Sequence, residues 1–239
     1  MRERGVARVP RPVIALLAST LVAQIAWQAA RPAPVARADA LAPPYSAAAT
    51  RTLSGNEPIA ASQLAALYLQ AFDNQPGVSV PFRDLDYARV EEWLESMLEL
   101  DPHTQYPLMM ASQLYAQVPV AQKQRAMLEF VHRKFLDDPD RRWRWLAHAA
   151  IMARHRLHDR RLALRYAEDI ARHSRGAPGW ARQMRIFIVE DMGERESAAI
   201  LLGGLLAGGE VTDPNEIRFL TGRLEALRAA EISSRPSPN

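Results

Sequence analysis

From residue 57 onward, apolar residues recur at intervals of three and four positions, between short polar stretches that often hold a proline. This spacing places the apolar side chains on one face of an α-helix. At 78–82, after the turn-forming Asn-Gln-Pro-Gly sequence at 74–77, apolar and polar residues alternate and predict an extended segment. The pattern therefore predicts an all-α domain. Its helices are expected near 58–72, 87–100, 105–117, 121–136, 141–155, 160–174, 179–192, 194–207 and 214–230.

Prolines divide this helical region at a nearly constant interval. Pro102, Pro139, Pro178 and Pro214 lie 37, 39 and 36 residues apart, and three of them follow an aspartate. A proline ends one helix or opens the next without losing an interior hydrogen bond, and the aspartate can cap the new helix. A period of this length indicates stacked helical hairpins.

The residues within these hairpins resemble the tetratricopeptide repeat family over about residues 86–230, in three to four imperfect repeats. Positions typical of the first helix of a repeat hold Leu108, Ala111, Ser112 and Tyr115, and Trp180 opens a later one. Positions typical of the second helix hold Val90, Leu94 and Met97, and less regularly Ala163 and Ala167. The resemblance implies antiparallel hairpins stacked as an α-solenoid, whose concave side binds extended protein segments. It implies no particular activity, and a non-repetitive helical array remains open.

The N-terminal region contains a run without charge, Val13–Ala30, preceded by four arginines and followed by Arg31. As a helix, its 18 residues span roughly 27 Å, about the thickness of a bilayer's hydrocarbon core. The excess of arginine before the run predicts a single-pass anchor, with the N-terminus cytoplasmic and the helical domain exported. In a bacterium this would be the periplasm. The preceding arginines are Arg2, Arg4, Arg8 and Arg11.

Two other interpretations of this run remain open. Small residues at 36, 38 and 40 match a signal-peptidase site, so the run can be a cleaved secretory signal. It can also be a buried helix of a cytosolic protein. With the anchor interpretation, the expected organisation is a basic cytoplasmic segment, an anchor, a Pro/Ala-rich linker, the repeat domain and a flexible tail. Their boundaries are 1–12, 13–30, 31–56, 57–232 and 233–239.

Charge is segregated along the chain, although the net charge is only +3. Residues 47–118 carry −6, residues 119–185 carry +9 and residues 186–239 carry −4. The basic residues of 119–185 either attract the acidic residues of neighbouring hairpins or form a surface that binds a partner with an acidic or extended segment. We favour the partner, and export across a membrane argues against nucleic acid. The expected partner-binding residues are Arg141, Arg142, Arg144, Arg154, Arg156, Arg160, Arg161 and Arg165.

The sequence offers little catalytic or cofactor chemistry. It has no cysteine, which excludes disulfides, zinc–thiolate sites and a cysteine nucleophile, and we expect no cofactor. His148 and His155 are separated by roughly 10 Å along a helix, too far to share one metal ion. The acidic residues at 91, 95 and 99 are expected to form a solvent-facing stripe rather than a catalytic pair. Nucleotide-binding and serine-hydrolase motifs are absent.

These features predict a membrane-tethered, non-catalytic protein-interaction module on the exported side of a membrane. One alternative is an accessory subunit whose apolar surface is permanently covered by a membrane assembly. Another is a helical envelope enzyme that acts on a polymer through carboxylates such as Glu190 or Asp191.

Overall fold

The computed structural model describes residues 10–31, 38–209 and 211–234, and the chain divides into two units. One unit is Met1–Asp39 with Asn74–Ser79, and the other is Ala40–Asp73 with Val80–Asn239. The first half of the chain forms α1 (Arg11–Ala30), α2 (Ala47–Leu53), α3 (Pro58–Ala71), β1 (Asn74–Gln75), β2 (Val78–Ser79), α4 (Tyr87–Leu100) and α5 (Tyr106–Met109). The second half forms α6 (Ala121–Asp137), α7 (Pro139–His155), α8 (Arg160–His173), α9 (Gly179–Asp191), α10 (Arg195–Ala207) and α11 (Pro214–Ser234).

In the first unit, α1 is long and apolar enough to cross a membrane, judged by its length and composition. It has 20 residues and a mean hydropathy of 1.7, and none of its side chains is buried. A signal sequence near an N-terminus has the same properties. The helix starts two residues before the expected run because Pro12 suits a first helical turn.

The same unit holds the short hairpin of β1 and β2. Asn74 pairs with Ser79 and Gln75 with Val78, and Gly77 adopts a φ of +78° that suits glycine in the turn. The Gln75 side chain accepts a hydrogen bond from the Asp39 N–H at 2.8 Å and donates one to the Asp39 carbonyl at 3.1 Å. The turn predicted at 74–77 is thus confirmed.

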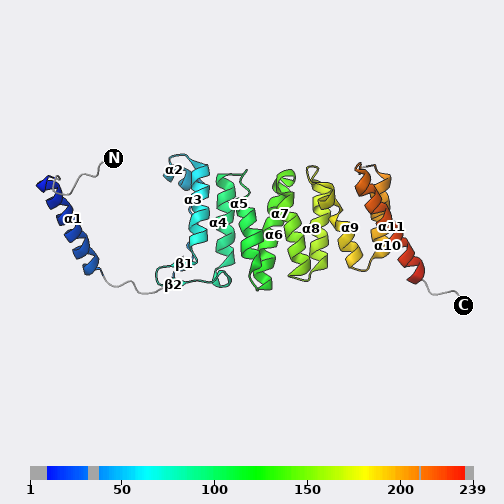
Figure 1. The fold of residues 1–239 in the computed structure, drawn as a ribbon, viewed down its shortest axis with the longest axis horizontal. Coiled ribbons are helices and arrows are strands. Elements are labelled where there is room, and N and C mark those ends of the chain that lie inside the picture. The colour runs from blue at the N-terminus through cyan, green and yellow to red at the C-terminus, as the bar shows by residue number, and fades with distance from the viewer. Residues whose placement is uncertain (1–9, 32–37, 210, 235–239) are drawn as a thin grey trace, which may run out of the picture. The chain divides into compact units, whose positions relative to one another are not determined.

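In the second unit, the helices from α3 to α11 follow one another as antiparallel neighbours (Figure 1). Each packs against the next along the chain, and further contacts join helices two positions apart, such as α4 with α6 and α7 with α9. Most helices begin and end within two or three residues of the expected bounds, because the apolar spacing that defines them is local. The all-α class is confirmed.

The predicted helix at 105–117 is irregular. Its α-helical turn, α5, continues as a π-helix at Met110–Leu114 and a 3-10 turn at Tyr115–Gln117. The buried hydroxyl of Tyr87 donates a hydrogen bond of 2.9 Å to the carbonyl of Tyr115, which gives this carbonyl a partner outside the helix. Leu108, Ala111 and Tyr115 are all fully buried.

The expected linker at 31–56 is only partly correct. Ala47–Leu53 forms a helix because the Ser46 hydroxyl caps it, accepting the Ala49 N–H at 3.3 Å. Leu41 is buried in the core, and the indole N–H of Trp93 donates to the carbonyl of Ala42 at 2.8 Å. Residues 41–56 of the expected linker therefore belong to the helical unit. Residues 1–9 and 32–37, and the last five residues of the expected tail, lie outside the described residues.

Candidate functional site

One of the arginines expected to bind a partner is buried instead. The Arg142 side chain lies at the start of α7 and the residue is only 4% exposed. Its guanidinium donates hydrogen bonds to the carbonyls of Lys134 at 2.6 Å and Pro102 at 2.9 Å. The Lys134 carbonyl is among the last four of α6, which lack partners within their own helix. Arg142 thus caps α6 and cannot belong to a binding surface, so this prediction is wrong.

Three further arginines form ion pairs between helices. Arg154 on α7 and Arg160 on α8 both bind Asp191 at the end of α9, each at 3.0 Å. Arg165 on α8 pairs with Glu129 on α6 at 2.5 Å. Hydrogen bonds from Arg160 and Arg154 hold the pKa of the Asp191 carboxyl below its usual range. These arginines are neutralised by carboxylates far away in sequence rather than by acidic residues of their own helices.

The other predicted arginines are exposed and less engaged. Arg141 forms an ion pair of 3.0 Å with Asp138, three residues earlier at the start of α7. The guanidinium carbon of Arg144 lies 5.9 Å from the centre of the Trp143 ring. Arg156 donates a weak hydrogen bond of 3.4 Å to Gln117. Arg161 makes no ion pair within the described part of the chain. Among the expected residues, Arg144, Arg156 and Arg161 are therefore those available to carboxylates of a partner.

The acidic stripe on α4 is also paired. Glu91 forms an ion pair with Arg133 and Glu95 with Lys134, both on α6. The expectation of a solvated stripe is wrong for these two residues because α4 and α6 lie in contact. The segregated charges of the sequence thus meet between helices that are consecutive, as for Arg160 and Asp191, or two positions apart, and the partners are separated by 31 to 42 residues.

The two carboxylates considered for catalysis, those of Glu190 and Asp191, form ion pairs with arginines. Glu190 on α9 pairs with Arg223 on α11, and Asp191 holds the two arginines described above. The lowered pKa of Asp191 makes this carboxylate a poor proton donor. Burial lowers the pKa of His148, a residue of α7 that lies against Ser112 of the π-helix. No group of three or more metal-ligating side chains occurs among the residues that the structure describes.

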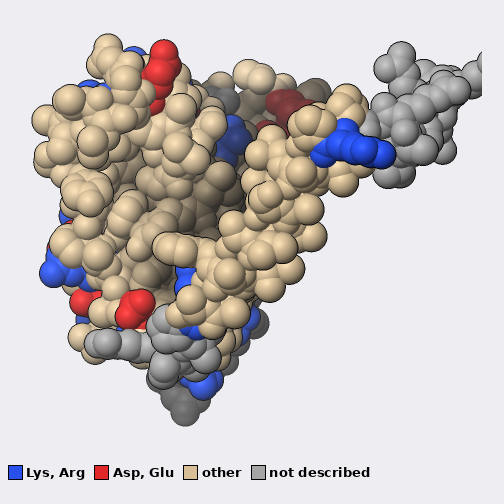
Figure 2. All heavy atoms as spheres, turned by 90° about the vertical axis from the view of Figure 1, so that its left-hand side faces the viewer, with Lys and Arg blue, Asp and Glu red and all other residues tan. Residues whose placement is uncertain are grey.

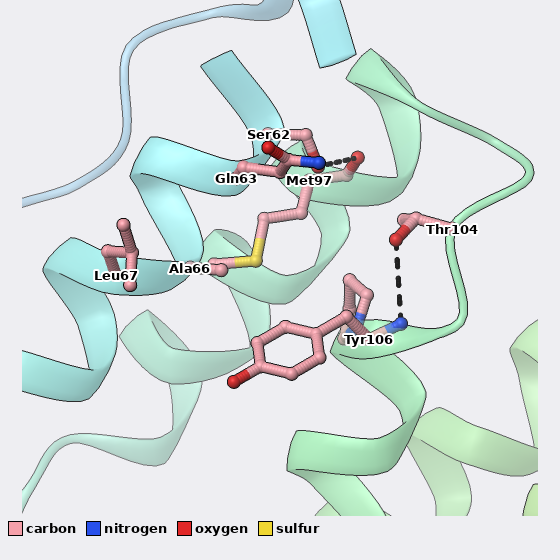
Figure 3. A pocket seen from close by; sticks show the side chains of 8 residues that line it. Ser62, Gln63, Ala66, Leu67, Met97, Thr104 and Tyr106 are labelled. Atoms are coloured by element: carbon pink, nitrogen blue, oxygen red, sulfur yellow. Dashed lines mark hydrogen bonds between the residues drawn. The ribbon is translucent and has the colours of Figure 1, made fainter. Parts of the chain in front are cut away.

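A groove lies between α3 and α5, and its lining is largely apolar. It has a volume of about 360 Å³, and α4 forms its floor with the fully buried Met97 (Figure 3). The Ser62 hydroxyl fixes α3 to this floor by donating to the Met97 carbonyl at 3.1 Å. The lining residues are Ser62, Gln63, Ala66, Leu67, Met97, Thr104, Tyr106 and Pro107.

Tyr106 forms the opposite wall of the groove. Its ring extends from the first turn of α5 under Ala66 and Met97 (Figure 3). Its hydroxyl accepts a hydrogen bond from the Gln70 side chain. Its backbone N–H reaches the Thr104 hydroxyl at 3.5 Å. The groove therefore offers apolar walls and a few neutral polar groups, without a charged side chain in its lining. Such a lining suits an uncharged peptide segment better than an acidic one.

No protein-family model, no curated protein and no solved structure matches the chain. The groove therefore has to be interpreted from its own geometry. The sequence did not predict the groove, because the groove depends on how far apart α3 and α5 pack against α4. The available signal was α3 itself, a helix of 14 residues without any charge.

Proposed function

We propose that the chain is a membrane-tethered, non-catalytic module that binds an extended protein segment in the groove between α3 and α5. The single observation behind this proposal is the groove, an open and largely apolar hollow with fixed hydroxyl and amide groups. The walls of the groove include the exposed residues Gln63, Leu67 and Tyr106. These residues would contact the side chains and the backbone of a segment that runs along α4. Recognition of peptides by apolar grooves with a few polar contacts is common in proteins.

The proposal includes a repeat architecture like that of tetratricopeptide proteins. Ion pairs and hydrogen bonds recur at separations of about one hairpin, which is the expected result of stacking equivalent units. Trp145 on α7 donates to Gln105 at 2.7 Å, and Trp143 meets Trp180 at a ring distance of 5.6 Å, again about one hairpin apart. In such an array, α3, α5, α7 and α9 would line the surface that binds a partner.

The proposed location is a membrane, with α1 as the anchor and the helical unit on the exported side. The length and composition of α1 support this, and the arginines that precede it support the orientation. Arg144, Arg156 and Arg161 would contribute a second, weaker contact to acidic residues that flank the bound segment. Exposed ion pairs of this kind mainly affect the rate of association.

A photo-crosslinking experiment tests the groove. The full chain is produced in its own membranes with benzoylphenylalanine in place of Gln63, which lines the groove, or Gln122, an exposed residue of α6. We expect one adduct of defined mass at position 63 and none at position 122, because only the first position would touch the bound segment. Adding Thr104→Trp should fill the groove and remove the adduct.

Equal adducts at positions 63 and 122 would show random collision and contradict the proposal. An adduct at position 63 that survives Thr104→Trp would also contradict it, because the partner would then bind outside the groove.

A further inference from the structure

Helix α3 presents an uncovered apolar face. Ala61, Ser62, Ala66 and Leu69 are buried, and the helix packs against α4. The opposite face holds exposed residues, among which Leu64 and Leu67 are 66% and 61% exposed. The side of the helical unit on which α2 and α3 lie carries few charged side chains (Figure 2). A helical array normally needs a polar outer face on its terminal helices, so this surface is costly in water.

The exposed residues of α3 follow the spacing of a two-helix seam. Ala60, Leu64, Leu67 and Ala71 are separated by four, three and four positions, which aligns them in one stripe. The stripe is also a palindrome, with a small residue at each end and leucines in the middle. Two antiparallel copies would place Ala60 opposite Ala71 and Leu64 opposite Leu67, twice over.

We propose that this stripe is a dimer seam, which a second copy of the chain occupies in antiparallel orientation. In any isologous interface residue i contacts j while j contacts i. For this stripe the symmetry would bring alanine against alanine at both ends and leucine against leucine in the middle, so that the two helices could approach closely along the whole seam. Because α3 carries no charge, two copies bring no like charges together. The same two copies would place Tyr68 of each chain beside Gln63 of the other, so that a hydroxyl meets an amide at the edge of the seam.

The dimer seam is short, and the membrane would strengthen it. A helix of 14 residues is roughly 21 Å long, so the pair buries less than a standard protein–protein interface. Attachment of both copies to one membrane raises their effective concentration and compensates for the small area. Only this compensation rests on the proposed membrane anchor. The pairing itself rests on the pattern of α3.

Cysteine crosslinking tests the pairing without background, because the chain has no cysteine of its own. Two full-length chains with different tags, one with Ala60→Cys and one with Ala71→Cys, are produced together in membranes and oxidised. We expect a disulfide-linked dimer that carries both tags. Each variant alone should give little dimer, because positions 60 and 71 are about 16 Å apart along the helix. Absence of the mixed dimer would overturn the proposal, as would equal crosslinking of each variant with itself.

A charge placed in the seam provides the second test. Leu64→Lys should abolish the mixed dimer, because it places a charge against the apolar Leu67 of the other copy, once in each half of the seam. Ile200→Lys on α10 is the matched control, since Ile200 is 68% exposed and lies outside the seam. Loss of the dimer in both variants, or in neither, would contradict the seam.

The two proposals can fail separately. Leu64 does not line the groove between α3 and α5. Gln63 and Leu67 border both surfaces, so a bound segment and a second copy compete for them. Leu64→Lys should therefore remove the mixed dimer and leave the photo-adduct at position 63 intact or stronger. If Leu64→Lys removes both, the adduct at position 63 is the second copy itself. The groove proposal then fails and the seam stands.

Discussion

Replacing Arg142 with methionine should lower the free energy of unfolding by about 2–4 kcal/mol. The guanidinium is buried and donates to two carbonyls, those of Lys134 and Pro102. Methionine fills similar space but leaves both carbonyls without this donor, and a buried acceptor without a partner is expensive. The loss also removes a positive charge from the end of α6, where the helix dipole favours a cation.

Arg141 provides the control for this substitution. It precedes Arg142 on the same helix, but half of its side chain is exposed and its only described ion pair is with Asp138. Arg141→Met should change the free energy of unfolding by less than about 0.5 kcal/mol, as expected of an exposed pair. Denaturant unfolding of the full chain in detergent, followed by circular dichroism, measures both. Equal losses for the two variants would contradict the capping role of Arg142.

Placing arginine at both Leu17 and Leu21 should release the chain from membranes or block its export. Each arginine in the middle of a membrane-spanning helix costs about 2.5–3.5 kcal/mol on insertion. Both leucines lie in the central part of α1, whose side chains are all exposed. The matched control, with isoleucine at both positions, should stay with membranes after a high-salt wash. Immunoblots of the washed membrane and soluble fractions measure the difference.

The anchor interpretation also predicts an intact N-terminus. N-terminal sequencing of the mature protein should begin at or near Met1. A sequence beginning at Asp39 or Leu41 would show instead that α1 is a signal removed on export, since these residues follow the two small-residue cleavage patterns.

The helices could be predicted from the sequence because their pattern is local. Apolar spacing, proline and capping residues placed α4 and α6 within one residue of their observed bounds. Helix α2 escaped prediction because it is short and lies in a Pro/Ala-rich stretch, where composition indicated a linker. The π-helix at Met110–Leu114 escaped because it lies within a segment where the periodicity predicted one regular helix.

The charged residues show where prediction from the sequence ends. The excess of arginine on α7 and α8 was visible, but the carboxylates that neutralise it lie on other helices, such as Glu129 and Asp191. Contacts across more than 30 residues depend on how helices stack, which no local pattern specifies. In the structure, single carboxylates on adjacent or next-but-one helices pair with these arginines, so the array is held together without an even mixture of signs along each helix.

Two triple variants measured by thermal unfolding decide most directly whether the basic side chains hold the array together. The first replaces the paired residues Arg154, Arg160 and Arg165 with glutamine. The second replaces Arg144, Arg156 and Arg161, which form no ion pair among the described residues. Both remove three charges, so net charge is matched. The structure predicts that the first triple lowers the unfolding midpoint by several degrees, less so at high salt, while the second leaves it nearly unchanged. Equal shifts in the two variants, or a larger shift in the second, would contradict a cohesive role for the paired arginines.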